Sequence, residues 1–305
     1  MTDTIKRGLV FALFAAFISG FSIFYNKLII VKGIDPQIFN ILKNGGAAVV
    51  LFSYLLASKK IISLTKLSTS SFGKLLFIAF IGGSIPFILY FEGLKTTPAL
   101  TANIIQKSMF LWVAIFAIPI LKETINRWQL IGYFLVLGSN FVIGGFQGFA
   151  GNVGELLIFA ATLFWSLENI IAKDVLKNVD ATVGAWSRMF LGALIIGGFV
   201  AFQGKLGLLF SLTLSQILPI FVSIILLTLY VTTWYKALKL APATAVTAIL
   251  ILATPITNIL TMIFITHTLS GEQMIQAGVA FLGVICIALL SSRVIIPIPT
   301  RLGHT

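Results

Sequence analysis

Two stretches of the chain, YFEGLKTTPALTANI at residues 90–104 and WYKALKLAPATAVTAI at residues 234–249, decide the fold. Both contain the pattern L-K-x-x-P-A, and its second occurrence comes 144 residues after the first. Further matches follow at an offset of 145 residues, because Asp35 aligns with Asp180 and Lys43 aligns with Arg188. Self-similarity at a fixed spacing indicates a repeated structural unit, so the chain is expected to contain two copies of one unit.

The composition indicates that this unit lies in a membrane. Of the 305 residues, 58% are hydrophobic and only 10% are charged, whereas soluble domains carry about 25% charged residues. Apolar segments of about 20 residues recur, and each can cross roughly 30 Å of hydrocarbon as a helix. Helices satisfy their own backbone groups in lipid, and the alternating segments of a β-barrel are absent. We therefore expect an all-α integral membrane protein with ten transmembrane helices, at residues 8–31, 36–57, 72–91, 98–121, 128–148, 154–173, 181–203, 214–237, 241–267 and 273–292.

The net charge of +12 indicates an orientation and not a nucleic-acid partner. Most Lys and Arg residues fall in segments on the side of the N-terminus, and few fall on the other side, namely Lys27, Lys32, Lys95 and Lys205. Cytoplasmic loops carry such an excess of basic residues. We expect a multi-pass protein of the plasma membrane with both termini in the cytoplasm. The first apolar segment lacks a small-residue cleavage site, which indicates a retained helix.

The number of helices in each copy determines how the two copies are related. Five helices are an odd number, so the second copy must enter the membrane from the opposite side. The predicted units are residues 1–148 and residues 149–305, related by a pseudo-two-fold axis in the membrane plane. Inverted repeats of this kind are typical of secondary transporters, which bind substrate between the halves near the bilayer midplane.

The repeated (F/Y)-x-(G/A)-L-K-x-x-P-A stretch resembles the drug/metabolite transporter superfamily, and specifically its ten-helix EamA-type carriers. The resemblance also includes Glu123 after the fourth helix and Gly132 nine residues later. It covers essentially the whole chain and implies a carrier fold without identifying a substrate. The halves are not equivalent, because His267 stands near the expected position of the second glutamate and Leu111 occupies the position that matches Pro255.

Lys43 and Arg188 are candidates for the substrate site, because each is a charge inside an apolar span. A charge near the bilayer centre costs at least about 2.5–3.5 kcal/mol on insertion scales. One interpretation places both cations in a central cavity, where they bind an anionic substrate group or a counter-ion carboxylate. The alternative is that both side chains extend to the nearest interface, with their alkyl stems in lipid.

Lys107 and Asn103 are four residues apart, so they share one face of the fourth helix. The ninth helix carries a polar stripe that includes Thr247 and Asn258. We expect both stripes to line the cavity. The alternative is that these polar groups form hydrogen bonds between helices or with their own backbone.

Glu168 and Trp165 are three residues apart in the sixth helix. Glu168 could pair with a buried cation, could bind a coupling proton, or could cap the cytoplasmic helix end. Trp165 could stack on a substrate ring. The predicted substrate-binding residues are therefore Lys43, Lys107, Arg188, Asn103, Glu168, Asn258 and Trp165.

Other function classes have little support in the sequence. Residues 198–205 lack the spacing and the Ser or Thr of a phosphate loop, and no Cys or His cluster indicates a metal site. We expect no enzyme activity and no cofactor. We expect a secondary transporter of an amino acid or another small organic solute, working by alternating access and coupled to a solute gradient or a proton. The alternatives are a non-transporting lipid-binding or regulatory protein and a passive channel. No oligomeric state is indicated.

Overall fold

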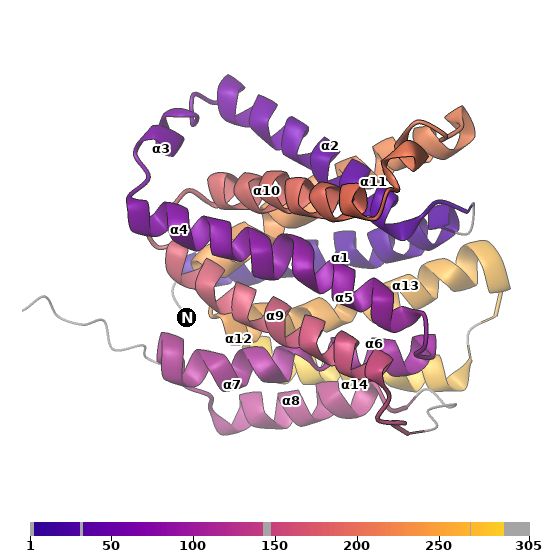
Figure 1. Ribbon diagram of the computed structural model, residues 1–305. Helices are drawn as coiled ribbons and strands as arrows, with labels where there is room; N and C mark the ends of the chain where they lie inside the picture. Colours follow the sequence, from indigo (N-terminus) through magenta and orange to yellow (C-terminus); the bar gives the residue numbers. More distant parts are fainter. Residues whose placement is uncertain (1–2, 31–32, 143–147, 269, 290–305) are drawn as a thin grey trace, which may run out of the picture.

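The computed structural model describes residues 3–30, 33–142, 148–268 and 270–289, and this part of the chain contains helices and no strands (Figure 1). The first half contains α1 (Asp3–Ile30), α2 (Pro36–Ala57), the short α3 (Ile62–Thr65), α4 (Thr69–Ile78), α5 (Ile85–Leu94), α6 (Ala99–Lys107), α7 (Met109–Leu121) and α8 (Arg127–Ser139). A π-helical turn, η1 (Ala79–Ser84), joins α4 to α5 in one span.

The second half repeats this order. It contains α9 (Val153–Val175), α10 (Ala181–Phe202), the 3₁₀ turn η2 (Leu206–Leu209), α11 (Leu214–Leu240), α12 (Ala243–Ile249), the 3₁₀ turn η3 (Leu250–Leu252), α13 (Ala253–Thr261), the π-helical turn η4 (Met262–Thr266) and α14 (Gly271–Leu289). The first half begins at one end of the bundle, on the left in Figure 1, and the second half begins with α9 at the other end. The two five-helix repeats therefore have inverted topology.

Nine helical segments in the described part are long and apolar enough to cross a membrane. The fifth predicted span, residues 128–148, is helical only as far as Ser139, and residues 143–147 of that prediction lie outside the described part. The last predicted span, residues 273–292, runs past the end of α14 at Leu289, and its remaining residues also lie outside the described part. The count of ten helices is thus approximate.

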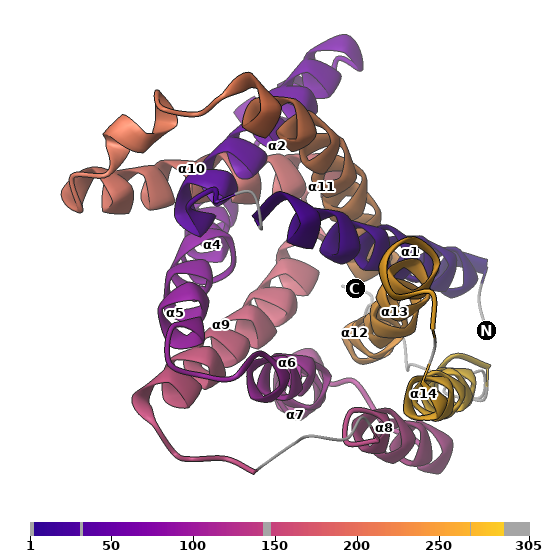
Figure 2. The same cartoon turned by 90° about the vertical axis from the view of Figure 1, so that its right-hand side faces the viewer.

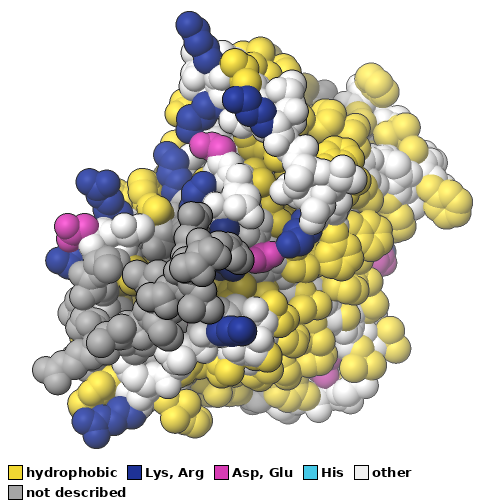
Figure 3. Space-filling model, turned by 90° about the vertical axis from the view of Figure 1, so that its left-hand side faces the viewer, with side chains coloured by type: hydrophobic (Ala, Val, Ile, Leu, Met, Phe, Trp, Pro, Cys, Tyr) yellow, Lys and Arg dark blue, Asp and Glu magenta, His cyan; other side chains and the backbone are white. Residues whose placement is uncertain are grey.

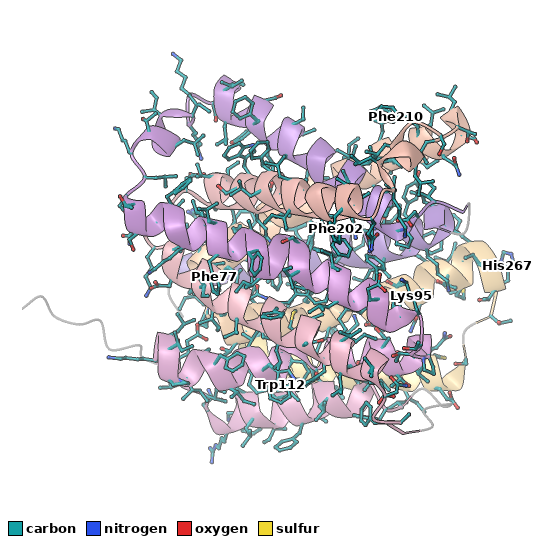
Figure 4. The ribbon with its side chains drawn as sticks, viewed as in Figure 1. Phe77, Lys95, Trp112, Phe202, Phe210 and His267 are labelled. Atoms are coloured by element: carbon teal, nitrogen blue, oxygen red, sulfur yellow. The ribbon has the colours of Figure 1, made fainter. Side chains whose placement is uncertain are left out.

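The end of the bundle that carries the N-terminus is rich in basic side chains (Figure 3). We call it the basic end, and it includes Lys60, Lys74, Lys122 and Lys177, which lie at or near helix ends. Lys95 and His267 lie at the opposite end (Figure 4). Large apolar side chains such as Phe134 and Phe202 are exposed along the helices, as expected for contact with lipid.

The repeated aspartates Asp35 and Asp180 begin equivalent helices. Asp35 accepts a hydrogen bond of 2.8 Å from the backbone N–H of Gln37 at the start of α2. Asp180 accepts one of 2.8 Å from Thr182 at the start of α10. Such caps satisfy backbone donors that have no partner within the helix. The caps fix the register of α2 and α10, so Lys43 and Arg188 are each the eighth residue of their helix.

The fourth span of each half is interrupted near its middle. In the first half α6 ends at Lys107 and α7 begins at Met109, and the hydroxyl of Ser108 between them donates a hydrogen bond of 2.6 Å to the Ile105 carbonyl. In the second half η3 separates α12 from α13 at the matching position. Pro119 lies inside α7 without ending it. Both interruptions therefore lie at the middle of the bundle, where transporters commonly bind substrate.

Glycines allow two pairs of helical segments to pack closely. α8 and α14 lie side by side at one edge of the bundle, away from α2 and α10 (Figure 2). A Cβ at Gly132 would lie 2.6 Å from the Gly283 carbonyl oxygen, so only glycine permits this approach. The same holds for Gly83 and Gly192, which bring η1 against α10. The Gly132 feature of the sequence thus serves helix packing.

Candidate transport cavity

A cavity of about 280 Å³ lies between the two halves. Helices α1, α2, α5, α6 and α7 of the first half and α9 to α13 of the second half contribute its lining residues. The lining includes Thr247, the fifth residue of α12, and Asn26 in the last part of α1.

Of the 23 lining residues, 16 form pairs related by the repeat. Ser19, Ser22 and Ile23 on α1 line the cavity, and so do Trp165, Glu168 and Asn169 on α9, 146 residues later. The same relation joins Lys43 and Asn44 to Arg188 and Met189 at an offset of 145, and Gln106, Lys107 and Met109 to Leu250, Ile251 and Ala253 at an offset of 144. The two halves thus present equivalent positions to the cavity with different side chains.

Five of the seven predicted site residues line this cavity, namely Lys43, Lys107, Trp165, Glu168 and Arg188. Asn103 is not among the lining residues. Asn258 is also absent from the lining, and its side-chain amide donates a hydrogen bond of 3.2 Å to Gln276 on α14. Lys43 and Arg188 therefore have the cavity-facing placement and not the interfacial one.

Glu168 and Arg188 form a buried ion pair across α9 and α10. Arg188 Nε lies 3.4 Å from Glu168 Oε1, and only 2% of the glutamate side chain is exposed. Tyr235 on α11 donates a hydrogen bond of 2.7 Å to the same carboxylate oxygen. A carboxylate with a cation and a hydroxyl donor can remain charged in an apolar interior. Of the roles expected for Glu168, the structure shows the ion pair with a buried cation, and the side chain does not cap a helix.

The π-helical turn η1 supplies the remaining partner of Arg188. The Gly82 carbonyl accepts hydrogen bonds of 2.9 Å from Arg188 Nη2 and of 3.2 Å from Trp165 Nε1. A π-helical turn disturbs the regular ladder of backbone bonds and often marks a functional site. A Cβ at Gly82 would overlap the side chain of Glu168. The first half thus holds the ion pair of the second half through one glycine carbonyl.

Lys43 and Lys107 have no carboxylate partner among the described residues. The ammonium of Lys43 lies 5.0 Å from the ring centroid of Phe39, and the charge of Arg188 is close enough to act on it. Next to it, Asn44 is 1% exposed and its amide nitrogen has no hydrogen-bond acceptor. The charged lining residues are three cations and one carboxylate, so the cavity is positive.

Aromatic side chains also line the cavity, and we call this part of the lining the aromatic wall. Trp165 packs against Phe87 with a ring-centroid distance of 5.3 Å, and Tyr230 stacks on Trp234 at 5.9 Å. Trp234 Nε1 donates a hydrogen bond of 3.0 Å to Asn169, which holds the indole in place. Aromatic rings held in this way offer a rigid apolar surface to a ligand.

Glu123 joins the two halves at the basic end. Its carboxylate accepts hydrogen bonds of 2.7 Å from the Ala243 N–H, of 3.1 Å from the Thr244 N–H and of 2.7 Å from the Thr244 hydroxyl. A residue that follows α7 in the first half therefore caps α12 in the second half. In the sequence, Glu123 is part of the family resemblance, but its partner Ala243 lies 120 residues away and only the fold brings them together.

A second contact between the halves at the basic end joins Lys60 to Asp180, with 2.9 Å between Lys60 Nζ and the carboxylate. Burial alone would raise the pKa of Asp180, but its hydrogen bonds with Lys60 and Thr182 outweigh burial and hold this pKa below the ordinary value. The same hydrogen bond raises the pKa of Lys60. The contact is therefore charged at neutral pH.

Among the described residues, the opposite end has no counterpart of the Glu123 cap. Lys122 and His267 both have left-handed backbone conformations, with φ of 55° and 52°, and each donates its N–H to a carbonyl five residues earlier. Glu123 therefore aligns with Thr268, and His267 aligns with Lys122. Thr268 is exposed, and its hydroxyl bonds to the Thr266 carbonyl. In the described part of the chain, Thr268 makes no hydrogen bond to the start of α6.

Comparison with known proteins identifies the family of this chain. The profile of the EamA-like transporter family matches residues 6–145 and, a second time, residues 152–289. The chain belongs to the EamA-like transporter family. It is therefore a multi-pass membrane transporter and is related to carriers and not to enzymes.

Two individual proteins are similar to this EamA-like chain. An uncharacterized transporter of Methanothermobacter thermautotrophicus is 27% identical over 128 residues, which are 40% of this chain and 37% of the relative. The match thus spans little more than a third of the relative's length. A solved crystal structure superimposes with a TM-score of 0.79 at 18% identity, over 94% of this chain and 98% of that one. This second likeness supports the fold alone.

Proposed function

We propose that this EamA-like protein is a secondary transporter for a small organic solute that carries a carboxylate or phosphate, such as an amino acid or an organic acid. The observation that supports the proposal is the cavity between inverted halves, lined by Lys43, Lys107 and Arg188 with Glu168 as the single carboxylate. Two cations in excess inside a low-dielectric bundle favour an anionic ligand.

A difference between the two ends of the bundle supports alternating access. At the basic end, the Glu123 cap and the Lys60–Asp180 pair at 2.9 Å join the halves. The matching pair at the opposite end, Lys205 with Asp35, is longer at 3.8 Å. The opposite end lacks the equivalent cap in the described residues. We infer that the conformation seen here receives solute from the opposite end, and that rocking of the halves breaks the Glu123 cap and exposes the cavity at the basic end.

The proposed membrane is the plasma membrane, with the basic end in the cytoplasm. This orientation is supported by the basic side chains at that end, because cytoplasmic loops carry an excess of Lys and Arg. Labelling of single cysteines on intact cells tests it. A cysteine at exposed Lys177 of a Cys286→Ser protein should be protected from an impermeant maleimide, and one at half-exposed Lys205 should react.

Counterflow in proteoliposomes tests the transport proposal. Purified full-length protein is first screened against metabolites for a ligand that raises its melting temperature, since binding to the folded state stabilises it. Vesicles loaded with that ligand should then take up labelled ligand faster than empty vesicles. Uptake that is equal in loaded and empty vesicles would indicate a channel, and the absence of uptake for every stabilising ligand would refute transport.

A pair of variants ties transport to the cavity. Lys107→Gln removes a cavity cation without a counter-ion, and we expect at least about a tenfold loss of counterflow, the scale of one lost charged contact. Glu92→Gln is the matched control, because Glu92 pairs with exposed Lys95 at 2.5 Å outside the cavity. Equal effects of the two substitutions would remove Lys107 from the solute path.

A further inference from the structure

The two halves of the cavity match in position but differ in charge. Arg188 in the second half has the carboxylate of Glu168 at 3.4 Å. Its counterpart Lys43 has Ser22 at the position that matches Glu168, and both Ser22 and Lys43 line the cavity. The pseudo-two-fold axis thus relates a neutralised cation in one half to a cation without a counter-ion in the other.

Two further substitutions between the halves strengthen this asymmetry. Asn44 occupies the position that matches Met189, and its buried amide nitrogen has no hydrogen-bond acceptor. Ser19 occupies the position that matches Trp165. A buried donor without an acceptor is unfavourable. The amide of Asn44 is therefore available to donate a hydrogen bond to an oxygen atom of a ligand. The smaller Ser19 and Ser22 leave room where the second half places larger side chains.

We propose that the anionic group of the substrate binds at the mirror position of Glu168, between Ser22, Lys43 and Asn44. The substrate carboxylate or phosphate takes the role for Lys43 that Glu168 has for Arg188, and Asn44 donates to one of its oxygens. The organic part of the substrate then lies toward the aromatic wall of the second half, formed by Trp165 and Tyr230. This inference rests on the proposed function, because it takes the cavity as the substrate path.

This placement of the substrate assigns different roles to Lys43 and Arg188. Lys43 contacts the substrate, whereas Arg188 is a positioning residue, because its Nη2 bonds to the Gly82 carbonyl and its charge is neutralised by Glu168. It holds η1 and Trp165 in place. Bound substrate therefore neutralises the first half in the same way that Glu168 neutralises the second.

A tethered carboxylate tests this site without any ligand. Ser22→Glu places a carboxylate at the position that matches Glu168, and Ser22→Gln is its uncharged control of the same size. In purified full-length protein at pH 7, we expect Ser22→Glu to melt about 2–4 °C higher than Ser22→Gln, the shift of one favourable charge pair. The difference should disappear when Lys43→Gln is added to both. Equal melting temperatures, or a difference that persists with Lys43→Gln, would overturn the proposal.

A second measurement covers the case in which Ser22→Glu does not fold. Lys43→Gln alone removes a cation without a counter-ion, so its melting temperature should equal or exceed that of the unmodified protein, whereas Arg188→Gln should lower it. Equal losses for the two variants would show that Lys43 already has a partner, which would overturn the proposal.

Binding of defined probes completes the test. Phenylacetate and phenyl phosphate each combine an anionic group with a ring, and phenylacetamide is the neutral analogue of the first. At least one anion should raise the melting temperature of the unmodified protein and of Ser22→Gln, but not of Ser22→Glu. Equal stabilisation by phenylacetamide, or none by either anion, would overturn an anion site. Failure of counterflow for every ligand would refute transport while the ligand-free comparison still decides the site.

Discussion

Removal of Arg188 tests the buried ion pair, because it leaves Glu168 without its cation. Glu168 is 2% exposed and keeps only the hydrogen bond from Tyr235. Breaking a buried pair by removing one partner costs about 3–5 kcal/mol. Unfolding entropy of about 2.1 cal/mol/K per residue makes 1 kcal/mol equivalent to about 1.6 °C for a chain of 305 residues. Arg188→Gln is therefore expected to lower the melting temperature by about 5–8 °C.

Thermal unfolding of purified protein, followed by intrinsic fluorescence or by scanning calorimetry, measures this loss. The double variant Arg188→Gln with Glu168→Gln removes both charges and should recover most of the stability. Lys74→Gln is the control, because Lys74 pairs with Asp174 at 2.7 Å on the surface and such pairs contribute about 0–1 kcal/mol. Similar shifts for Arg188→Gln and Lys74→Gln, or no recovery in the double variant, would refute the reasoning.

Three further predictions concern the packing and the closed end. Gly192→Ala would place a Cβ 2.6 Å from the Gly83 carbonyl and should destabilise the protein by about 1–3 kcal/mol, whereas Gly198→Ala meets nothing within 4 Å and should be neutral or slightly stabilising; similar melting temperatures would contradict this. Glu123→Gln loses the charged cap of α12 and should cost about 1–2 kcal/mol, which denaturant unfolding can measure. The pKa of Asp180 is lowered in the folded state, so its contribution to stability is present above about pH 4 and is lost as the pH falls through that lowered pKa. Asp180→Asn should therefore flatten the dependence of the melting temperature on pH below pH 4, and an unchanged slope would contradict the assignment.

The sequence predicted the parts of the fold that depend on local chemistry and on the repeat. Apolar length identified the spans, and an odd number of helices in each copy required inversion of the second copy. The repeat also paired Lys43 with Arg188, which proved to be the eighth residues of equivalent helices. The sequence left open whether these two cations face a cavity or extend to the nearest interface, and in the structure both line the cavity.

Interruption of the spans was less predictable. Pro119 lies within the fourth span, but α7 continues through that residue and the break lies at Ser108. The break at Ser108 involves a hydroxyl that bonds to the backbone carbonyl of Ile105, and this chemistry has only a weak sequence signal. Asn258 looked equivalent to a cavity residue on the helix face, but in the structure it bonds to Gln276.

The sequence by itself determined the class of protein, the inverted repeat and the presence of charge inside the membrane, because each depends on residue type and spacing along one chain. The tertiary structure alone decided which cation is neutralised. Glu168 meets Arg188 and Tyr235 because α9, α10 and α11 converge, whereas the position that matches Glu168 in the first half is Ser22, which lines the cavity with Lys43. Which side chains from separate helices meet depends on how those helices pack. Contacts between residues far apart in the sequence leave no periodic pattern in it.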